Sequence, residues 1–365
     1  MFAVLHRKTL DSQKKMTMYY SVKSCWLVFR TLVGFALYIA DFVTDVILAV
    51  EYAIYDHYYW FGLTLGFALV PQIIVNMILW KKDGCKWYYV LGLGVPAKYI
   101  QVLYAFFCRK ENTSGDRETD KHKSVARAVN DLLPLARLVG TLLESFPEIC
   151  LQIYVLLRTG ELNSLEIQNL KAFTMAVSFL ASLYSIMEWE ASFPNVKAWV
   201  WGPFVFVWKI IDLPARILAL CLFASIYEVR YWVFVMVGVH WLVMVGVENY
   251  FSLCLNKGKD SKRCKRFMFN TFLYSPMDVF TWVTFGSRER RIGQSIANGL
   301  LTLVANILMV LVWYFVLEKD NWSWYVTPVE VLGLLIGGSV ASFLLQIIYC
   351  VCYQPCCPCS HMGRV

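Results

Sequence analysis

The chain has 365 residues, of which 58% are hydrophobic and only 16% are charged, and its formal net charge is +8. Its mean hydropathy of +0.52 lies outside the range of soluble globular proteins, which excludes an ordinary soluble enzyme. Apolar runs of about 20 residues recur from Trp26 onward, and as helices they would cross the roughly 30 Å hydrocarbon layer. We therefore predict an all-α, polytopic membrane protein.

Eight apolar runs are predicted to be transmembrane helices, at about 26–52, 58–80, 128–158, 167–187, 203–227, 231–255, 294–317 and 329–353. The basic residues 1–25 precede a long apolar run without a cleavage site, so we expect a basic cytosolic N-terminus and no signal peptide. Two further runs, about 87–107 and 267–286, contain glycine, proline and polar residues and do not fit a simple crossing.

The distribution of Lys and Arg decides how these two irregular runs are placed. If both enter the membrane and return on the same side, 25 of the 34 Lys and Arg residues fall on one face and three on the other. By the positive-inside rule the rich face is cytosolic. We therefore expect two re-entrant segments, with both termini in the cytosol.

This arrangement predicts two parallel, pseudo-symmetric repeats, related by an axis along the membrane normal. The first repeat covers 26–187, with a re-entrant segment at about 87–107 and a cytosolic loop at 108–127. The second covers 203–353, with a re-entrant segment at about 267–286. A cytosolic linker, 188–202, joins the repeats, and a Cys-rich cytosolic tail, 354–365, follows the second.

Charged residues inside the predicted spans are the candidates for a functional site: Asp41, Asp45, Arg137, Glu144, Glu148, Lys209, Asp212 and Arg216. Asp41 and Asp45 share a helical face, and Pro147 interrupts the run that carries the two glutamates. An ionisable group at mid-membrane costs at least about 2.5 to 3.5 kcal/mol, so such groups must pair or face water.

Two interpretations of these charges can coexist. One is a set of buried ion pairs that fixes helix packing, for instance Glu144 with Arg137 and either Asp41 or Asp45 with Arg216. The other is a polar groove through which a charged or zwitterionic group crosses the membrane.

Motifs of soluble enzymes are missing, including a Gly-rich phosphate loop, H-E-x-x-H and a nucleophile elbow. We expect no enzymatic activity, no cofactor, no metal site and no nucleic-acid partner. The cysteines at the end of the last run are too nearly contiguous to wrap a zinc ion. Their juxtamembrane cytosolic position favours S-palmitoylation over free thiols. The candidates for this modification are Cys352, Cys356, Cys357 and Cys359.

Four blocks of the sequence together resemble the XK-related family. They are DFVTDVILAVEYA, ESFPEICLQIYVLL, WKIIDLPARILALCLFA and a last span that runs into a Cys-rich tail. The resemblance covers about Trp26 to Cys359, and ESFPEICLQIY is its most specific part. Family members usually have Glu-(Thr or Ser)-Ala-Pro-Gln-Leu at that block, so this chain departs from the pattern at Phe146 and Glu148.

The resemblance implies a eukaryotic eight-span protein with two re-entrant segments in two repeats. Several members of the family are phospholipid scramblases that expose phosphatidylserine in dying cells after caspases remove a tail, whereas XK associates with a bridge-type lipid-transfer protein and a membrane-bound peptidase. The resemblance places Asp41, Asp45 and Glu144 along or near the lipid path. Glu148, Lys209, Asp212 and Arg216 are added on physical grounds alone.

We therefore expect an energy-independent phospholipid scramblase in the plasma membrane. The alternatives are a membrane anchor that recruits a lipid-transfer protein and a solute or ion transporter. Expected partners are phospholipids, a single-span accessory subunit or cytosolic lipid-transfer protein, and a second copy in a homodimer. Caspase activation is doubtful, because the cytosolic candidates Asp11, Asp116 and Asp120 lack the second aspartate that caspases favour.

Overall fold

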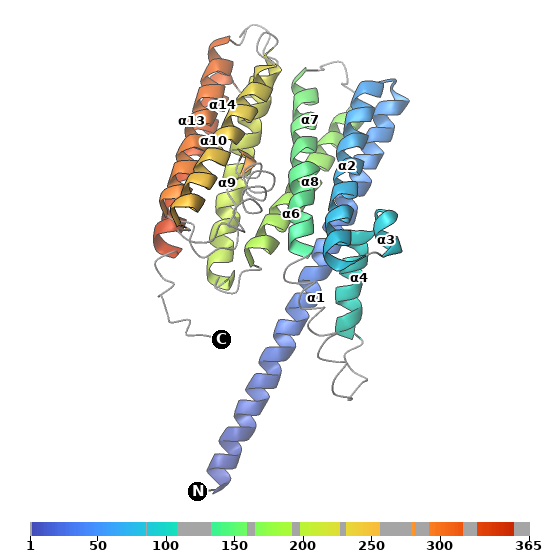
Figure 1. The fold of residues 1–365 in the computed structure, drawn as a ribbon, viewed down its shortest axis with the longest axis vertical. Helices are drawn as coiled ribbons and strands as arrows, with labels where there is room; N and C mark the ends of the chain where they lie inside the picture. Colours follow the sequence, from blue (N-terminus) through green and yellow to red (C-terminus); the bar gives the residue numbers. More distant parts are fainter. Residues whose placement is uncertain are drawn as a thin grey trace.

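The structure is a computed structural model in which nearly all of the described chain is helical. It describes residues 2–84, 86–107, 133–158, 165–191, 198–226, 231–255, 279–281, 292–316 and 327–353, and no strand occurs within these ranges. The helices form an elongated bundle, and helix α1 projects beyond one end of it (Figure 1). Helix α14, which ends at Tyr353, also ends toward that side of the bundle.

Among the described residues, six helical segments are long and apolar enough to cross a membrane, which confirms the prediction of an all-α membrane protein. They are Val28–Ile54, Tyr58–Asp83, Leu133–Leu157, Gln168–Glu190, Ser295–Val316 and Pro328–Cys352. These segments lie in helices α1 (Phe2–Ile54), α2 (Tyr58–Asp83), α6 (Leu133–Leu143) with α7 (Ser145–Arg158), α8 (Leu165–Ala191), α13 (Ile292–Val316) and α14 (Pro328–Tyr353).

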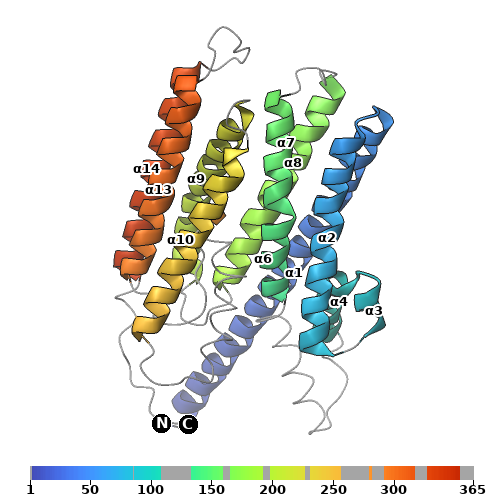
Figure 2. The same ribbon diagram turned by 45° about the horizontal axis from the view of Figure 1, so that its top comes forward.

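Two more long helices correspond to the remaining predicted runs. Helix α9 covers Ala198–Ser225 and would be about 42 Å long at 1.5 Å per residue. It carries three charged side chains, Lys209, Asp212 and Arg216, in its middle. Helix α10 covers Trp232–Leu255, with a shorter apolar stretch at Trp232–Val247. Both helices contact α13 and each other, as the view in Figure 2 also shows.

The irregular run 87–107 forms two short helices, α3 (Trp87–Val90) and α4 (Gly94–Phe107). The turn between them contains Gly92 with a φ of 77°, a conformation that side chains with a Cβ rarely adopt. With 14 residues, α4 is about 21 Å long and falls short of the hydrocarbon thickness. It packs against α1, α2 and α6, so this segment folds back onto the bundle.

The run predicted at 128–158 is broken in its middle, as its proline indicated. Helix α6 ends at Leu143 and α7 begins at Ser145, with Glu144 in a turn between them. Pro147 has no backbone N–H, so the hydrogen bond it would donate in a continuous helix is missing. The chain nevertheless continues in nearly the same direction, because Glu148 N donates to Glu144 O at 3.0 Å. The break therefore places a glutamate backbone in the middle of a membrane-spanning segment.

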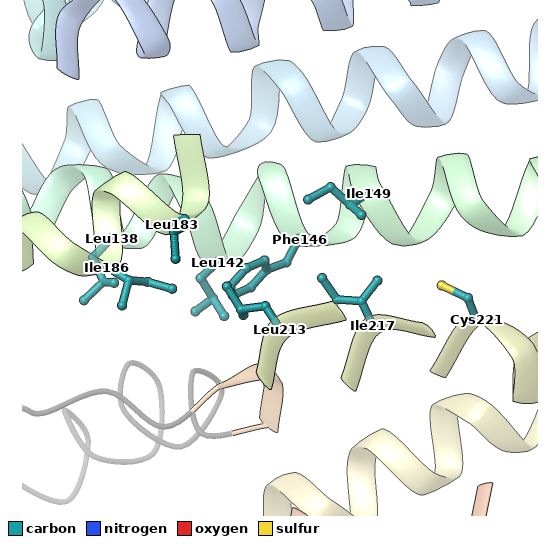
Figure 3. Close-up of a cluster of buried hydrophobic side chains, with 9 residues drawn as sticks. All are labelled: Leu138, Leu142, Phe146, Ile149, Leu183, Ile186, Leu213, Ile217 and Cys221. Atoms are coloured by element: carbon teal, nitrogen blue, oxygen red, sulfur yellow. The ribbon is translucent and has the colours of Figure 1, made fainter. Parts of the chain in front are cut away.

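The two halves of the chain meet in an apolar core (Figure 3). Helices α6, α7 and α8 from the first half pack there against α9 from the second. The core contains Leu138, Leu142, Phe146, Ile149, Leu183, Ile186, Leu213, Ile217 and Cys221. Since all of these side chains are buried, this contact positions the polar groups on the other faces of α7 and α9.

Several expected boundaries shift or lie outside the described residues. Helix α1 extends as one helix through most of the expected N-terminal segment 1–25. Helix α8 continues to Ala191 and α9 begins at Ala198, so both enter the expected linker 188–202. The loop 108–127 and the tail 354–365 lie outside the described residues. Of the second irregular run, 267–286, only residues 279–281 are described.

Candidate functional site

Four carboxylates from the candidate set come together inside the first half of the bundle, and we call them the acidic cluster: Asp41, Asp45, Glu144 and Glu148. Their exposed fractions are 6%, 0%, 4% and 1%, respectively. The two aspartates lie on one face of α1, which contacts α8, while the two glutamates lie at and just beyond the α6–α7 break. The proline-interrupted run and the DFVTD block thus form one site.

Neutral polar groups hold three of the four carboxylates. Ser145 Oγ donates to Asp41 Oδ2 at 2.9 Å, and Gln72 Nε2 donates to Glu144 Oε2 at 2.8 Å. Gln152, one helical turn beyond Glu148, donates to Glu148 Oε1 at 2.5 Å. These contacts connect α1, α2 and α7 through side chains that carry no positive charge.

Asp45 is the least satisfied member of the acidic cluster. Both of its carboxylate oxygens are buried and have no hydrogen-bond partner among the described residues, and the same holds for Asp41 Oδ1 and Glu148 Oε2. Within the described part of the chain, no ion pair reaches any of the four carboxylates. A buried, unmatched carboxylate is costly, so the cluster must be completed by hydration, by protons or by a ligand.

Two tyrosines of α1 extend this polar network along the helix. Tyr38 donates to Gln72 Oε1 at 2.7 Å and Tyr52 donates to Gln152 Oε1 at 2.6 Å. They lie 14 residues apart, which is about 21 Å along an α-helix. The acidic cluster and the polar side chains from Tyr38 to Tyr52, which we call the polar column, therefore cover about two thirds of a typical hydrocarbon layer. Lys171 lies at the Tyr52 end, with its Nζ 5.5 Å from the centroid of the Tyr52 ring.

Arg137 does not pair with Glu144, so that expected ion pair is wrong. Its guanidinium donates to the backbone carbonyl of Gly34, the hydroxyl of Tyr99 and, at 3.0 Å, Ser185 Oγ. It thereby joins α1, α4 and α8 at one end of the acidic cluster. The absence of a Cβ at Gly34 permits this approach, since a Cβ there would lie 3.2 Å from the guanidinium.

A cavity of about 20 Å³ lies between Arg137 and the acidic cluster, which is enough for about one ordered water. Asp41, Gln72, Glu144 and Ser185 line it together with apolar side chains. Because the cavity is lined by polar side chains and lies within the bundle, it can hold an ordered water or a group of similar size. In this state it is too narrow for a phospholipid headgroup, so passage would require the surrounding helices to separate.

The remaining candidates, Lys209, Asp212 and Arg216, form a separate cluster in the second half, which we call the paired cluster. Lys209 Nζ lies 3.6 Å from Asp212 Oδ2, and Thr281 and Ser342 each donate to an Asp212 oxygen at 2.7 Å. Arg216 donates to Val279 O at 2.8 Å and to the side chain of an asparagine on α13. The expected ion pair of Arg216 with Asp41 or Asp45 is therefore wrong.

The two departures from the expected family block have different surroundings. Phe146 is 3% exposed and packs in the apolar core, with its ring centroid 5.3 Å from that of Phe280. Glu148 points into the acidic cluster and bonds Gln152. The first change thus serves packing between the halves, and the second adds a carboxylate to the polar column.

Several polar residues of the site were missed by sequence reasoning: Tyr38, Tyr52, Gln72, Ser145, Gln152 and Lys171. A usable signal was present for two of them. Gln152 follows Glu148 at i+4, and Gln72 precedes Asn76 at the same spacing within an apolar run, so each pair shares a helix face. No group of three or more described His, Cys, Asp or Glu side chains has metal-binding geometry.

The proposed modification and cleavage sites are only partly covered. Cys352 lies exposed in the last turn of α14, whereas Cys356, Cys357 and Cys359 lie outside the described residues. Asp11 lies within helix α1, although proteolytic cuts concentrate in exposed loops. Asp116 and Asp120 lie outside the described residues.

Comparisons with known proteins place the chain in a family. Residues 29–355 match the family model described as XK-related protein. The chain is 24% identical over 226 residues to XK-related protein 8 of Tetraodon nigroviridis, a match that covers 54% of this chain and 53% of that protein. It is 21% identical over 385 residues to the endoplasmic reticulum membrane adapter protein XK of Pan troglodytes, covering 88% of this chain and 82% of that protein.

The matches to XK-related protein 8 thus span about half the length of those relatives, as a second one from Gasterosteus aculeatus also shows, with 56% of each chain covered. The family model, by contrast, covers most of the chain, including α1 from Phe29 onward, the α6–α7 break, the paired cluster and α14. The chain belongs to the XK-related family.

Proposed function

We propose that this chain is an energy-independent phospholipid scramblase whose lipid headgroups pass along the acidic cluster. The observation that carries the proposal is the burial of four carboxylates, with four oxygens that lack partners among the described residues. A structural ion-pair scaffold would have matched these oxygens, as the paired cluster matches Asp212. An unmatched acidic column suits transient contact with a cationic group instead.

The chemistry of the column fits the amine or quaternary ammonium of a glycerophospholipid headgroup. Carboxylates can replace part of the hydration shell of this group, and Arg137 at one end can attract the phosphate. Acyl chains would remain in the surrounding lipid while the headgroup moves, so the step requires no energy source. Phosphatidylserine exposure during apoptosis is the process that we assign to this activity.

The proposed topology has eight spans, formed by the six apolar segments together with α9 and α10. The charges of α9 are compatible with a membrane span, because Lys209 and Arg216 are 0% and 1% exposed and bond to groups inside the bundle. The fold-back of α3 and α4 supports the first re-entrant segment. We place both termini in the cytosol and the protein in the plasma membrane.

Reconstitution into liposomes tests the proposal. The purified protein is incorporated together with a fluorescent phospholipid, and a bilayer-impermeant reductant is added outside. Scrambling predicts that the reductant bleaches nearly all of the lipid, whereas protein-free liposomes keep their inner-leaflet signal. If the inner-leaflet signal survives with folded protein, in the presence and absence of calcium and after limited proteolysis, the proposed activity is wrong.

A second function, membrane adapter, is favoured by the long match to XK, which is named an adapter protein. In this function the basic segment 256–266, outside the described residues, would hold a cytosolic lipid-transfer protein. Neutralising Lys262, Arg263, Lys265 and Arg266 would then abolish co-purification of that partner. The liposome assay separates the two functions, because an adapter alone transfers no lipid between leaflets.

A further inference from the structure

The end of α2 carries a charged hub that the acidic cluster does not use. Asp83 Oδ2 accepts hydrogen bonds from Lys86 Nζ at 2.6 Å, from Lys98 Nζ at 2.5 Å and from Tyr89 OH at 2.8 Å. Lys98 is only 2% exposed, and its bond to Asp83 connects α4 to α2 inside the protein. One carboxylate thus faces two ammonium groups, and the hub keeps a net positive charge.

Positive charge continues outward from this hub. Lys81, in the last turn of α2, is exposed, and Lys86 is partly exposed, with 39% of its side chain accessible. Partial burial lowers the pKa of Lys86, but the interactions with Asp83 and Tyr88 together outweigh this effect and hold the pKa above its ordinary value. The Lys86 side chain is therefore charged at neutral pH.

An apolar ledge begins at the residue after Lys86. It consists of α3 and the turn after it, where Trp87, Val90 and Leu91 are 71%, 69% and 64% exposed. The positive φ values of Gly84 and Gly92, 86° and 77°, set the turns that bracket the ledge. Exposed aromatic and aliphatic groups next to lysines are typical of the zone between lipid headgroups and acyl chains.

We propose that this corner, formed by Lys81, Lys86 and the ledge Trp87–Leu93, is a binding site for an anionic glycerophospholipid. The lysines bind the phosphate and any carboxylate of the headgroup, and the ledge packs against the acyl chains. Charge complementarity favours an anionic lipid over a zwitterionic one. The ledge favours a lipid over a soluble phosphate, because a soluble anion would leave these apolar side chains in water.

The corner is also connected to the acidic cluster by side chains of α2. Gly94 N at the start of α4 donates to Asn76 Oδ1 at 2.8 Å, Asn76 Nδ2 donates to Gln72 O at 2.6 Å, and Gln72 bonds Glu144 at 2.8 Å. A lipid that holds the corner thus stabilises the same elements that hold Glu144. Binding should therefore raise the unfolding temperature of the whole bundle.

The test measures lipid binding at equilibrium, so it does not depend on scrambling. Detergent-purified full-length protein is titrated with phosphatidylcholine, with phosphatidylserine and with soluble glycerol phosphate, and bound lipid is counted by native mass spectrometry. The melting temperature is recorded in parallel. The variants are Lys81→Gln and Lys86→Gln, with Lys81→Arg as the matched control that keeps the charge and Trp87→Ser to test the ledge.

We expect phosphatidylserine to bind and to raise the melting temperature, with little effect of phosphatidylcholine or glycerol phosphate. Each lysine-to-glutamine change should weaken phosphatidylserine binding roughly fivefold, and Lys81→Arg should bind as the unaltered protein does. Trp87→Ser should weaken binding without removing the preference for anionic lipid. The proposal is overturned if Lys81→Gln and Lys86→Gln bind phosphatidylserine as tightly as the unaltered protein, or if glycerol phosphate binds equally well.

Discussion

The acidic cluster and the paired cluster each contain carboxylates inside the bundle, yet these carboxylates are satisfied in opposite ways. In the second half, Asp212 has a cation at 3.6 Å and a hydroxyl on each oxygen. In the first half, Asp45 is 0% exposed, against 15% for the Asp212 side chain, yet it has no hydrogen-bond partner among the described residues. The difference indicates that intramembrane charge serves packing in one half and is available to a ligand in the other.

The largest expected loss of stability follows from a substitution that disrupts the paired cluster. Asp212→Ala removes a carboxylate that lies 3.6 Å from Lys209 Nζ and accepts from two hydroxyls. Removing one partner of a buried pair costs about 3–5 kcal/mol, so the melting temperature in detergent should fall steeply. Asp212→Asn is the matched control, because it keeps acceptor capacity and should lose less. Equal stability of Asp212→Ala and the unaltered protein would contradict a packing role.

A large effect on transport, with a smaller one on stability, is expected from Glu144→Gln. The amide can still accept the hydrogen bond from Gln72, but it cannot attract a cationic headgroup. A hydrogen bond to a charged group contributes about 1.5–3 kcal/mol, which corresponds to a roughly tenfold or greater loss of scrambling rate. Rates in liposomes are compared at equal amounts of folded protein. An unchanged rate would remove Glu144 from the lipid path.

The Tyr52 hydroxyl tests how far the polar column extends. Tyr52→Phe leaves the ring against Lys171 but removes the hydrogen bond to Gln152. We expect a loss of about 1 kcal/mol in unfolding free energy, measured by thermal or denaturant unfolding in detergent. Tyr38→Phe, which removes the equivalent bond to Gln72, is the matched variant at the other end. If neither change alters stability, the column is not a connected network.

The smallest effect on stability is expected at Asp45. Asp45→Asn replaces a buried carboxylate without described partners by a neutral side chain of nearly the same shape. Because an unmatched buried charge is costly, the unfolding free energy should stay within about 0.5 kcal/mol or increase. The contrast with Asp212→Ala in the same unfolding assay sharpens the comparison between the clusters. A large destabilisation by Asp45→Asn would show that Asp45 has a structural partner after all.

The sequence predicted the elements of the fold more reliably than the partners of its charges. Apolar runs predicted the long helices, and Pro147 predicted the break beside Glu144, because these features depend on local composition and on backbone chemistry. The partners of Arg137 are a backbone carbonyl, a tyrosine and a serine from three different helices, and no local pattern specifies them. Lys98 was placed within an irregular run, but its bond to Asp83 depends on how α4 folds back on α2.

The most direct test of the account compares scrambling by three proteins in one liposome assay. The unaltered chain, the Asp41→Asn/Glu144→Gln double variant and Asp212→Asn are reconstituted at equal amounts of folded protein. The account predicts that the double variant loses most of its lipid flux, while Asp212→Asn keeps its flux per folded molecule. Undiminished flux in the double variant, or an equal loss in Asp212→Asn, would contradict a lipid path along the acidic cluster.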